Sequence, residues 1–289
     1  MWCHTLRAMP MFCRHNRLTA KCPICSRELQ ADLKSTAPVS SSRPRAASTR
    51  GSTGSRRSGV VTKRLARAAD DGYRNALVPG LRATADAERL AAALAAAAAR
   101  LEPPGPYPEI AAEPDLEEAT WLAFLLAIEA DERPSWASGE SPASDARTAG
   151  AYRAWAQRAG SQARAFEGEP SWTPQRRFSR VFERLALPGF ARAARFELLT
   201  ALGAAGRYPL EAGELHLAAG EDATTEAAKR VLVSGDKLLL ERRARDLAEA
   251  AGVPLGALDR ALATWGTPGD HADLAAEAPA PIRAALSLR

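Results

Sequence analysis

The strongest folding signal in this 289-residue chain is a pair of amphipathic segments separated by Leu187-Pro188-Gly189-Phe190. Thr173-Pro174 predicts a helix start, because threonine caps helix N-termini and proline is tolerated at the first helical position. Apolar residues then recur with the i, i+3, i+4, i+7 spacing of one buried helix face: Phe178, Val181, Phe182 and Leu185. A second helix is predicted from Ala191 to about Gly203, with its own apolar positions facing inward.

The remainder of the chain after residue 60 has helical rather than strand periodicity. Asp115 with Glu118 three residues later predicts a capping box, and the apolar run that follows predicts the central buried helix. Residues 133–145 are predicted to form a loop. Further helices are predicted over 61–78, 86–101, 149–166, 224–233, 237–251 and 255–265. No convincing alternation of apolar and polar residues indicates a strand, so the predicted fold class is all-α.

The four cysteines lie within the first 25 residues, in a pattern typical of a metal site. Cys13, His15, Cys22 and Cys25 form a C-x-H-x6-C-x2-C motif, which offers four ligands for a tetrahedral zinc ion. Because four protein ligands close the coordination shell, we expect a structural Zn²⁺ and no metal-activated water. Unligated thiols are the alternative, and Cys3 or His4 could replace a ligand.

Charge is distributed unevenly along the chain. The totals are 39 Lys and Arg against 34 Asp and Glu, yet no acidic residue occurs between Leu33 and Ala69, where nine basic residues lie. Residues 35–60 are rich in Ser, Arg, Gly and Pro and predict a flexible basic linker. The predicted organisation is therefore a zinc-binding segment at 1–34, a linker at 35–60 and a helical region at 61–289.

Apolar runs are too short for a membrane span, which needs about 18 or more consecutive apolar residues. The first eleven residues also lack the apolar core of a signal peptide. These features predict a cytoplasmic protein without a membrane partner, located with the nucleoid if it binds DNA.

The Leu187, Pro188 and Gly189 turn is a candidate DNA-binding element. In a helix-hairpin-helix, such a turn directs backbone N–H groups and a helix N-terminus at a DNA phosphate. Arg192 and Arg195 are placed to add to that contact, and four arginines make the polar face of the preceding helix basic: Arg176, Arg177, Arg180 and Arg184. The alternative is a turn that only joins two packed helices, with the arginines on a solvated face.

Two aspartates are candidate catalytic groups, Asp222 and Asp236. Each precedes a predicted helix, so each is either an N-terminal cap or a carboxylate beside a cleft. Lys229 and Arg230 follow Asp222 and are either surface charges or DNA contacts. The chain has no Ser-His-Asp order, HExxH helix or P-loop, which argues against the corresponding hydrolases and NTPases.

The segment from residue 178 to 265, with ERLALPGFARAARFELL, AAKRV and SGDKLLLERRARDLAEAAGVPLGALDRAL, resembles the third, actinobacterial clade of the α-glutamyl/putrescinyl thymine pyrophosphorylase family. FCRHNRLTAKCPIC, DDGYRNALVPGLR and EEATWLAFLLAIE are similar to that group too. The resemblance implies a helix-hairpin-helix DNA glycosylase-like fold. It also implies a reaction on a modified thymine, in which an amine such as glutamate or putrescine displaces pyrophosphate from a 5-hydroxymethyl pyrimidine.

Within this resemblance, the hairpin corresponds to Leu187, Pro188 and Gly189, and the catalytic carboxylate to Asp222. A base would have to leave the DNA stack to reach that carboxylate, with Trp172, Phe190 or Tyr208 lining its pocket. The expected function is therefore a DNA-binding enzyme that modifies or excises a pyrimidine base. The alternatives are a non-catalytic DNA-binding module and a protein-interaction adaptor that uses its apolar helices.

The cysteine motif predicts one zinc ion per chain. Metal analysis of the purified protein should return about one Zn²⁺ per chain, because four ligands form one tetrahedral site. Replacement of Cys22 and Cys25 by Ala should abolish zinc binding, whereas replacement of Cys3 should not. Protein without zinc whose thiols all titrate freely would contradict the site.

Overall fold

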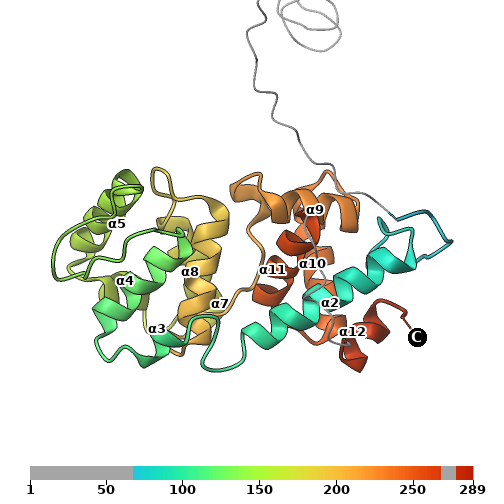
Figure 1. The fold of residues 1–289 in the computed structure, drawn as a ribbon, viewed down its shortest axis with the longest axis horizontal. Helices are drawn as coiled ribbons and strands as arrows, with labels where there is room; N and C mark the ends of the chain where they lie inside the picture. Colours follow the sequence, from blue (N-terminus) through green and yellow to red (C-terminus); the bar gives the residue numbers. More distant parts are fainter. Residues whose placement is uncertain (1–67, 268–277, 289) are drawn as a thin grey trace, which may run out of the picture. The chain divides into compact units, whose positions relative to one another are not determined.

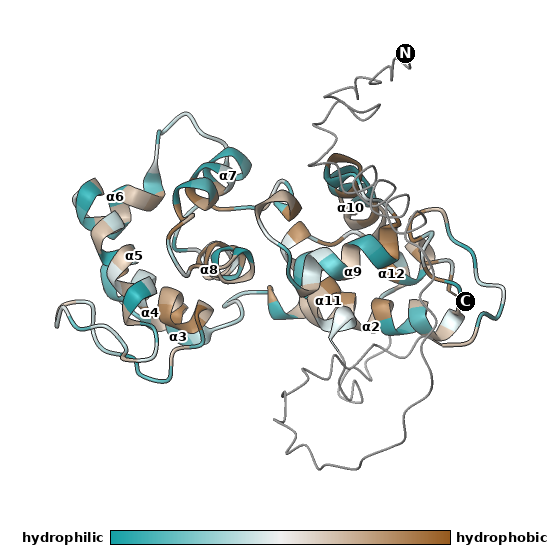
Figure 2. Ribbon diagram, turned by 90° about the horizontal axis from the view of Figure 1, so that it is seen from above, coloured by the Kyte–Doolittle hydropathy of each residue, from teal (hydrophilic) through white to brown (hydrophobic). Residues whose placement is uncertain are grey.

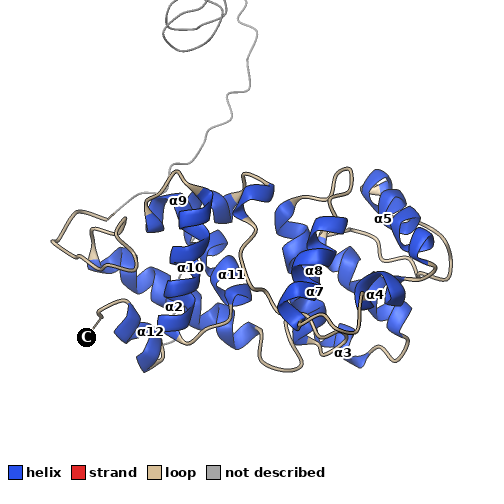
Figure 3. Cartoon of the chain, turned by 180° about the vertical axis from the view of Figure 1, so that it is seen from behind, coloured by secondary structure: helices blue, strands red, loops and turns tan. Residues whose placement is uncertain are grey.

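The computed structural model describes residues 68–267 and 278–288, all within a unit that spans residues 61–289. Every regular element in these described residues is helical, and none is a strand (Figure 3). The all-α prediction is thus confirmed for this part of the chain. None of the helices described is long and apolar enough to cross a membrane. The predicted zinc segment and linker lie outside the described residues.

The labels of the helices are those of Figure 1. They are α2 (Thr84–Arg100), α3 (Pro108–Ala112), α4 (Leu116–Ala127), α5 (Ala146–Ala159), α6 (Gln162–Glu167), α7 (Pro174–Arg184), α8 (Arg192–Ala204), the 3-10 turn η2 (Leu217–Ala219), α9 (Ala223–Leu232), α10 (Lys237–Ala251), α11 (Leu255–Gly266) and α12 (Ala280–Ala285).

Helix contacts sort these elements into two groups (Figure 1). In one group α3, α6 and α8 pack on α4, α5 packs on α6, and α7 packs on both α6 and α8. The first described helix, α2, instead packs on α11 and α12 near the end of the chain. Small buried residues allow this close contact, because alanines line both helices: Ala87 and Ala91 on α2, Ala257 and Ala261 on α11.

Helix α4 forms the centre of its group, as predicted. Trp121, Phe124 and Tyr152 are fully buried, and the ring of Phe124 stacks on Tyr152 with centroids 4.1 Å apart. The inward face of α7 is likewise buried as expected, with Phe178, Val181, Phe182 and Leu185 all at most 1 % exposed. Hydropathy changes from residue to residue along these helices, as amphipathic packing requires (Figure 2).

The helix predicted over residues 61–78 is wrong for its described part, since residues 68–83 are irregular. Short polar side chains bind the local backbone there: Asp70 accepts from the N–H of Gly72, and Asn75 accepts from those of Leu77 and Val78. Such bonds compete with the helical ladder. Asn75 and Tyr73 also donate to carbonyls of the chain's last described turn, which anchors the segment.

Two other helix predictions need correction in detail. The helix predicted over 149–166 is divided into α5 and α6 at Gly160, whose φ of +93° ends α5 in the left-handed conformation. Asp115 caps α4 as predicted, but Glu118 does not complete the capping box. Its carboxylate instead accepts from Ser135 and from two amides of the 133–145 loop. Helices α3 and α12 were not predicted from the sequence.

Two helical glycines should respond oppositely to replacement by alanine. A Cβ at Gly203 in α8 would lie 2.3 Å from the carbonyl oxygen of Leu210, whereas a Cβ at Gly150 in α5 meets no atom within 4 Å. Gly150→Ala should therefore stabilise the protein by about 0.5–1 kcal/mol through helix propensity. Gly203→Ala should lower the free energy of unfolding. Equal effects in denaturant titrations would contradict the packing of α8 on the 205–210 turn.

Candidate functional site

The turn between α7 and α8 has a geometry that its sequence explains. Phe190 donates its N–H to the carbonyl of Leu187 at 3.0 Å, which closes a four-residue turn with Pro188 and Gly189 at its centre. Gly189 has φ +83°, as the third position of a type II turn requires. A Cβ there would also lie 2.3 Å from Thr148 Oγ1. Glycine is thus required both by conformation and by the close approach of α5.

The turn leaves polar backbone groups exposed at the start of α8. Pro188, Gly189 and Ala191 are exposed, and the N-cap residue Ala191 offers no side-chain acceptor to the first amides of the helix. Among the described residues, no acceptor is found for the N–H of Gly189. Free amides at a helix N-terminus carry partial positive charge, so this position can bind an anion.

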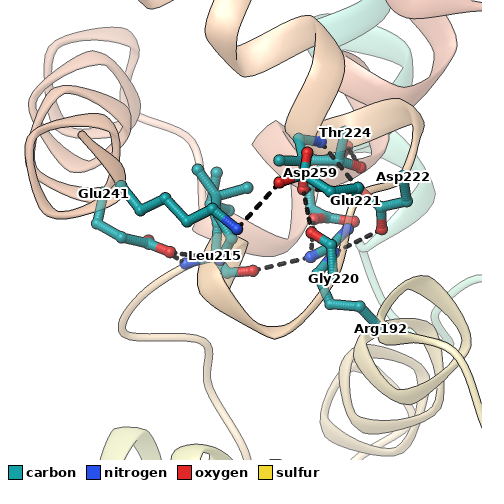
Figure 4. Close-up of polar contacts among 11 residues, drawn as sticks. Arg192, Leu215, Gly220, Glu221, Asp222, Thr224, Glu241 and Asp259 are labelled. Atoms are coloured by element: carbon teal, nitrogen blue, oxygen red, sulfur yellow. Dashed lines mark hydrogen bonds and ion pairs between the residues drawn. The ribbon is translucent and has the colours of Figure 1, made fainter. Parts of the chain in front are cut away.

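Arg192 is not available to a phosphate, contrary to the role predicted for it. Its side chain is 1 % exposed. Its Nε donates to Asp222 at 2.5 Å, and its Nη1 donates to Asp259 at 2.9 Å and to the carbonyl of Leu215 at 2.8 Å (Figure 4). The guanidinium therefore connects α8 to α9, to α11 and to the segment before η2.

Arg195 is likewise buried rather than presented at the surface. It lies over the ring of Phe182, 4.3 Å from the ring centroid, and Nη1 donates to the carbonyl of Phe182 at 3.3 Å. The exposed arginines of this region are on α7 instead: Arg176, Arg180 and Arg184. The fourth arginine of that helix, Arg177, is buried and donates to backbone carbonyls.

Both candidate catalytic aspartates are helix caps. Asp222 accepts from the N–H of Thr225 at the start of α9, in addition to its ion pair with Arg192. Asp236 accepts from the N–H of Leu238 at the start of α10, where its side chain is exposed. The capping alternative therefore holds at both positions, and only Asp222 is brought together with a predicted DNA-binding residue.

Lys229 and Arg230 take part in ion pairs along α9. The ammonium of Lys229 lies 2.5 Å from Glu221 and 3.7 Å from Glu226, and Arg230 lies 3.9 Å from Glu226. All these side chains are at least a third exposed. Solvent-exposed pairs of this kind contribute little stability, so both cations can exchange their partners for another anion.

A cavity of about 500 Å³ adjoins the two hairpin helices. Its wall includes Phe182 and Ala186 on the α7 side, Arg195 on α8, His216 before η2, and Glu241 on α10. The predicted base-pocket aromatics Trp172, Phe190 and Tyr208 are absent from this wall and lie buried in the core.

Two titratable groups of the cavity wall, His216 and Glu241, are fixed in place by contacts with neighbouring residues. The imidazole of His216 stacks on Phe182 with ring centroids 4.1 Å apart, and its Nε2 is buried without a hydrogen-bond partner among the described residues. The carboxylate of Glu241 accepts from the N–H groups of Leu215 and Leu217, at 2.7 and 2.6 Å. Glu241 thereby fixes the backbone on both sides of His216. Its contact with Leu215 is drawn in Figure 4.

Burial changes the acidity of three groups around this site. It lowers the pKa of His216 to about 4, with Arg192 and Arg195 adding to the effect, so the imidazole is neutral at pH 7. It raises the pKa of Asp259 to about 6, although the Arg192 guanidinium opposes the change. It also raises the pKa of Glu241, against the two hydrogen bonds from Leu217 and Leu215.

These shifts have opposite effects on stability. The contribution of His216 to the free energy of unfolding is complete above pH 6.5. It is lost as the pH falls toward 4, because the imidazole of the unfolded chain binds a proton at a higher pH than that of the folded chain. The contribution of Asp259 is complete below pH 3.8 and is lost as the pH rises through about 6.

Sequence reasoning missed His216, Glu241 and Asp259. A signal existed for His216, since Leu215-His216-Leu217 places a lone histidine between apolar residues. None existed for Glu241 or Asp259, which lie within ordinary charged helix sequences. No group of three or more metal-ligating side chains occurs in the described ranges, and the predicted ligands Cys13, His15, Cys22 and Cys25 lie outside them.

Comparison of the chain with protein-family models, with curated proteins and with solved structures gives no match.

Arg192→Met should lower the free energy of unfolding by about 3–5 kcal/mol, because it leaves Asp259 buried without its counter-ion. The loss should be larger at pH 8 than at pH 5, where Asp259 can take up a proton. The control is Arg180→Met, which removes an exposed pair with Glu183 and should cost less than about 1 kcal/mol. A loss from Arg192→Met as small as that of the control, measured by urea denaturation, would contradict the ion-pair assignment.

Proposed function

We propose that this chain is a DNA-binding enzyme that holds the DNA backbone at the Pro188–Gly189 turn and acts on a base placed in the adjoining cavity. The observation that carries the proposal is the exposed turn, which leads into the uncapped N-terminus of α8. Phosphate is the anion that such backbone groups bind without regard to base sequence.

The charges on α7 support the same assignment. Arg176, Arg180 and Arg184 are exposed on the helix that precedes the turn, and the one ion pair of Arg180 within the described residues is with exposed Glu183. Arginines on one helix beside a phosphate site extend contact along the DNA backbone. DNA binding is therefore assigned to the turn and α7, and no longer to Arg192 or Arg195.

The cavity supports a catalytic role for the protein. Its wall includes Ala186, close to the turn, and a neutral imidazole whose Nε2 has no partner in the described part of the chain. A neutral histidine can accept a proton from an attacking nucleophile, although its low pKa makes it a weak base. The resemblance to thymine pyrophosphorylases supplies the substrate in this proposal: a modified thymine, with glutamate or putrescine as the amine.

A non-catalytic DNA-binding module is the second candidate function. It is favoured by the position of Asp222 and Asp236, because both carboxylates are used as helix caps and Asp222 is also paired with Arg192. This candidate needs only the turn and the arginines of α7.

Ala191→Asp should weaken DNA binding at least tenfold at low salt while it stabilises the protein. An aspartate at this N-cap would satisfy the free amides of α8, for about 1 kcal/mol of added stability, and would repel a phosphate. Ala191→Ser is the matched control, since it caps the helix without adding charge. Fluorescence anisotropy with a duplex oligonucleotide measures the affinity. If Ala191→Asp binds DNA as tightly as wild type does, the turn is not the DNA site.

His216→Asn separates the two candidate functions. Asparagine tolerates the left-handed backbone of this residue, φ +54°, and removes the imidazole. If the protein is an enzyme, the variant should keep its DNA affinity, and its rate of conversion of a modified-thymine oligonucleotide should fall at least tenfold. Mass spectrometry of the oligonucleotide, with each amine present, measures this rate. If wild-type protein binds this oligonucleotide but leaves the mass of the oligonucleotide unchanged, the non-catalytic module is favoured.

A further inference from the structure

The cavity beside α7 and α8 contains a buried cation whose hydrogen-bonding capacity is mostly unused. Arg195 lines this cavity and is 6 % exposed. Its Nη1 makes one long hydrogen bond, at 3.3 Å, and its Nε is buried without a partner among residues 68–267 and 278–288. No other hydrogen bond or ion pair of this guanidinium occurs in the part of the chain that the structure describes.

The two other buried arginines of the described region are much better satisfied. Arg192 is paired with two carboxylates and also donates to one carbonyl, although its Nη2 has no partner among the described residues. Arg177 donates to three backbone carbonyls, at 2.6, 3.1 and 3.5 Å. Buried charges are normally paired or fully hydrogen-bonded, because removal from water is costly. Arg195 is the exception among these three.

The carboxylates of the cavity wall do not compensate for Arg195. Glu241 accepts from two backbone amides, Glu214 lies 3.3 Å from the imidazole of His216, and Glu183 pairs with Arg180. None of them is within ion-pair distance of Arg195 in the described structure. Burial lowers the pKa of Arg195, and the neighbouring Arg192 lowers it further.

A second cation lies on the same wall. Lys237 contacts Glu221 at 3.1 Å, but that carboxylate is more than half exposed and can be displaced. Two cations match the charge of a phosphate monoester, which is about −1.5 to −2 at pH 7, and they also suffice for the single negative charge of a DNA phosphodiester. Guanidinium groups bind phosphate oxygens through their N–H donors, and the Nη2 group of Arg195 makes no hydrogen bond among the described residues.

We propose that this cavity binds a phosphate group, with Arg195 as its principal partner and Lys237 as the second. The phosphate comes either from a small phosphate monoester or from a strand of bound DNA. The site is separate from the Pro188–Gly189 turn, so it does not depend on DNA binding there.

The test is calorimetric titration of the full chain with inorganic phosphate and with thymidine 5′-monophosphate. Arg195→Met should weaken both affinities at least tenfold, and its melting temperature without ligand should be equal to or above that of wild type, because an unpaired buried charge has been removed. Arg177→Met is the matched control. It should lose thermal stability and keep its phosphate affinity wherever it remains folded.

A second readout needs no variant. Phosphate bound beside Arg195 should raise the pKa of His216 from about 4 toward 6.5, as seen in the NMR titration of its ring protons. The proposal would be overturned if Arg195→Met bound phosphate within threefold of wild type. It would also be overturned if the pKa of His216 did not change at saturating phosphate.

Competition distinguishes the two sources of the phosphate. If a duplex oligonucleotide displaces the monophosphate from wild type and from Ala191→Ser, the site takes a DNA phosphate. If the monophosphate binds in an Arg195-dependent way whether or not DNA is present, the ligand is a free monoester. The second result also stands if the turn fails to bind DNA, so the two proposals fail separately.

Discussion

The described fold depends on one buried guanidinium. Arg192 is the first residue of α8, and it joins the cap of α9, the middle of α11 and the carbonyl of Leu215. Two carboxylates around one arginine would repel each other without it, and Asp259 could not remain charged at this depth. The same contacts fix the segment that carries His216. Arg192 therefore connects the start of α8, directly after the Pro188–Gly189 turn, to the segment that carries His216.

Much of the helical framework could be predicted from local sequence patterns. Thr173-Pro174 and Asp115 begin helices as capping rules require, and the apolar face of α7 is buried as its spacing indicates. Failures occurred where side chains bind nearby backbone, as at Asn75, or where one glycine interrupts a long helical pattern, as at Gly160. The spacing of apolar residues contains no information about side-chain hydrogen bonds to the backbone or about a glycine that ends a helix.

The candidate site was harder to predict, because its key contacts join residues far apart in the chain. Arg192 and Arg195 have the spacing and charge of surface arginines, and only tertiary packing makes them internal. Asp259 occurs in a helix of ordinary composition, 67 residues after the arginine that it neutralises. By contrast, the exposure of the Pro188–Gly189 turn agrees with its sequence, since a proline and a left-handed glycine rarely fit inside a packed core.

The anchoring of residues 73–75 has a consequence for how this protein can be cut and rejoined. Tyr73 donates to the carbonyl of Leu286 and Asn75 to that of Ala285, across 213 and 210 positions of sequence. The two ends of the described helical unit are thus neighbours in space. A circular permutant that links them directly would preserve the packing, with new termini in an exposed loop such as 137–140. Conversely, deletion of the last turn would release a segment at the opposite end of the chain.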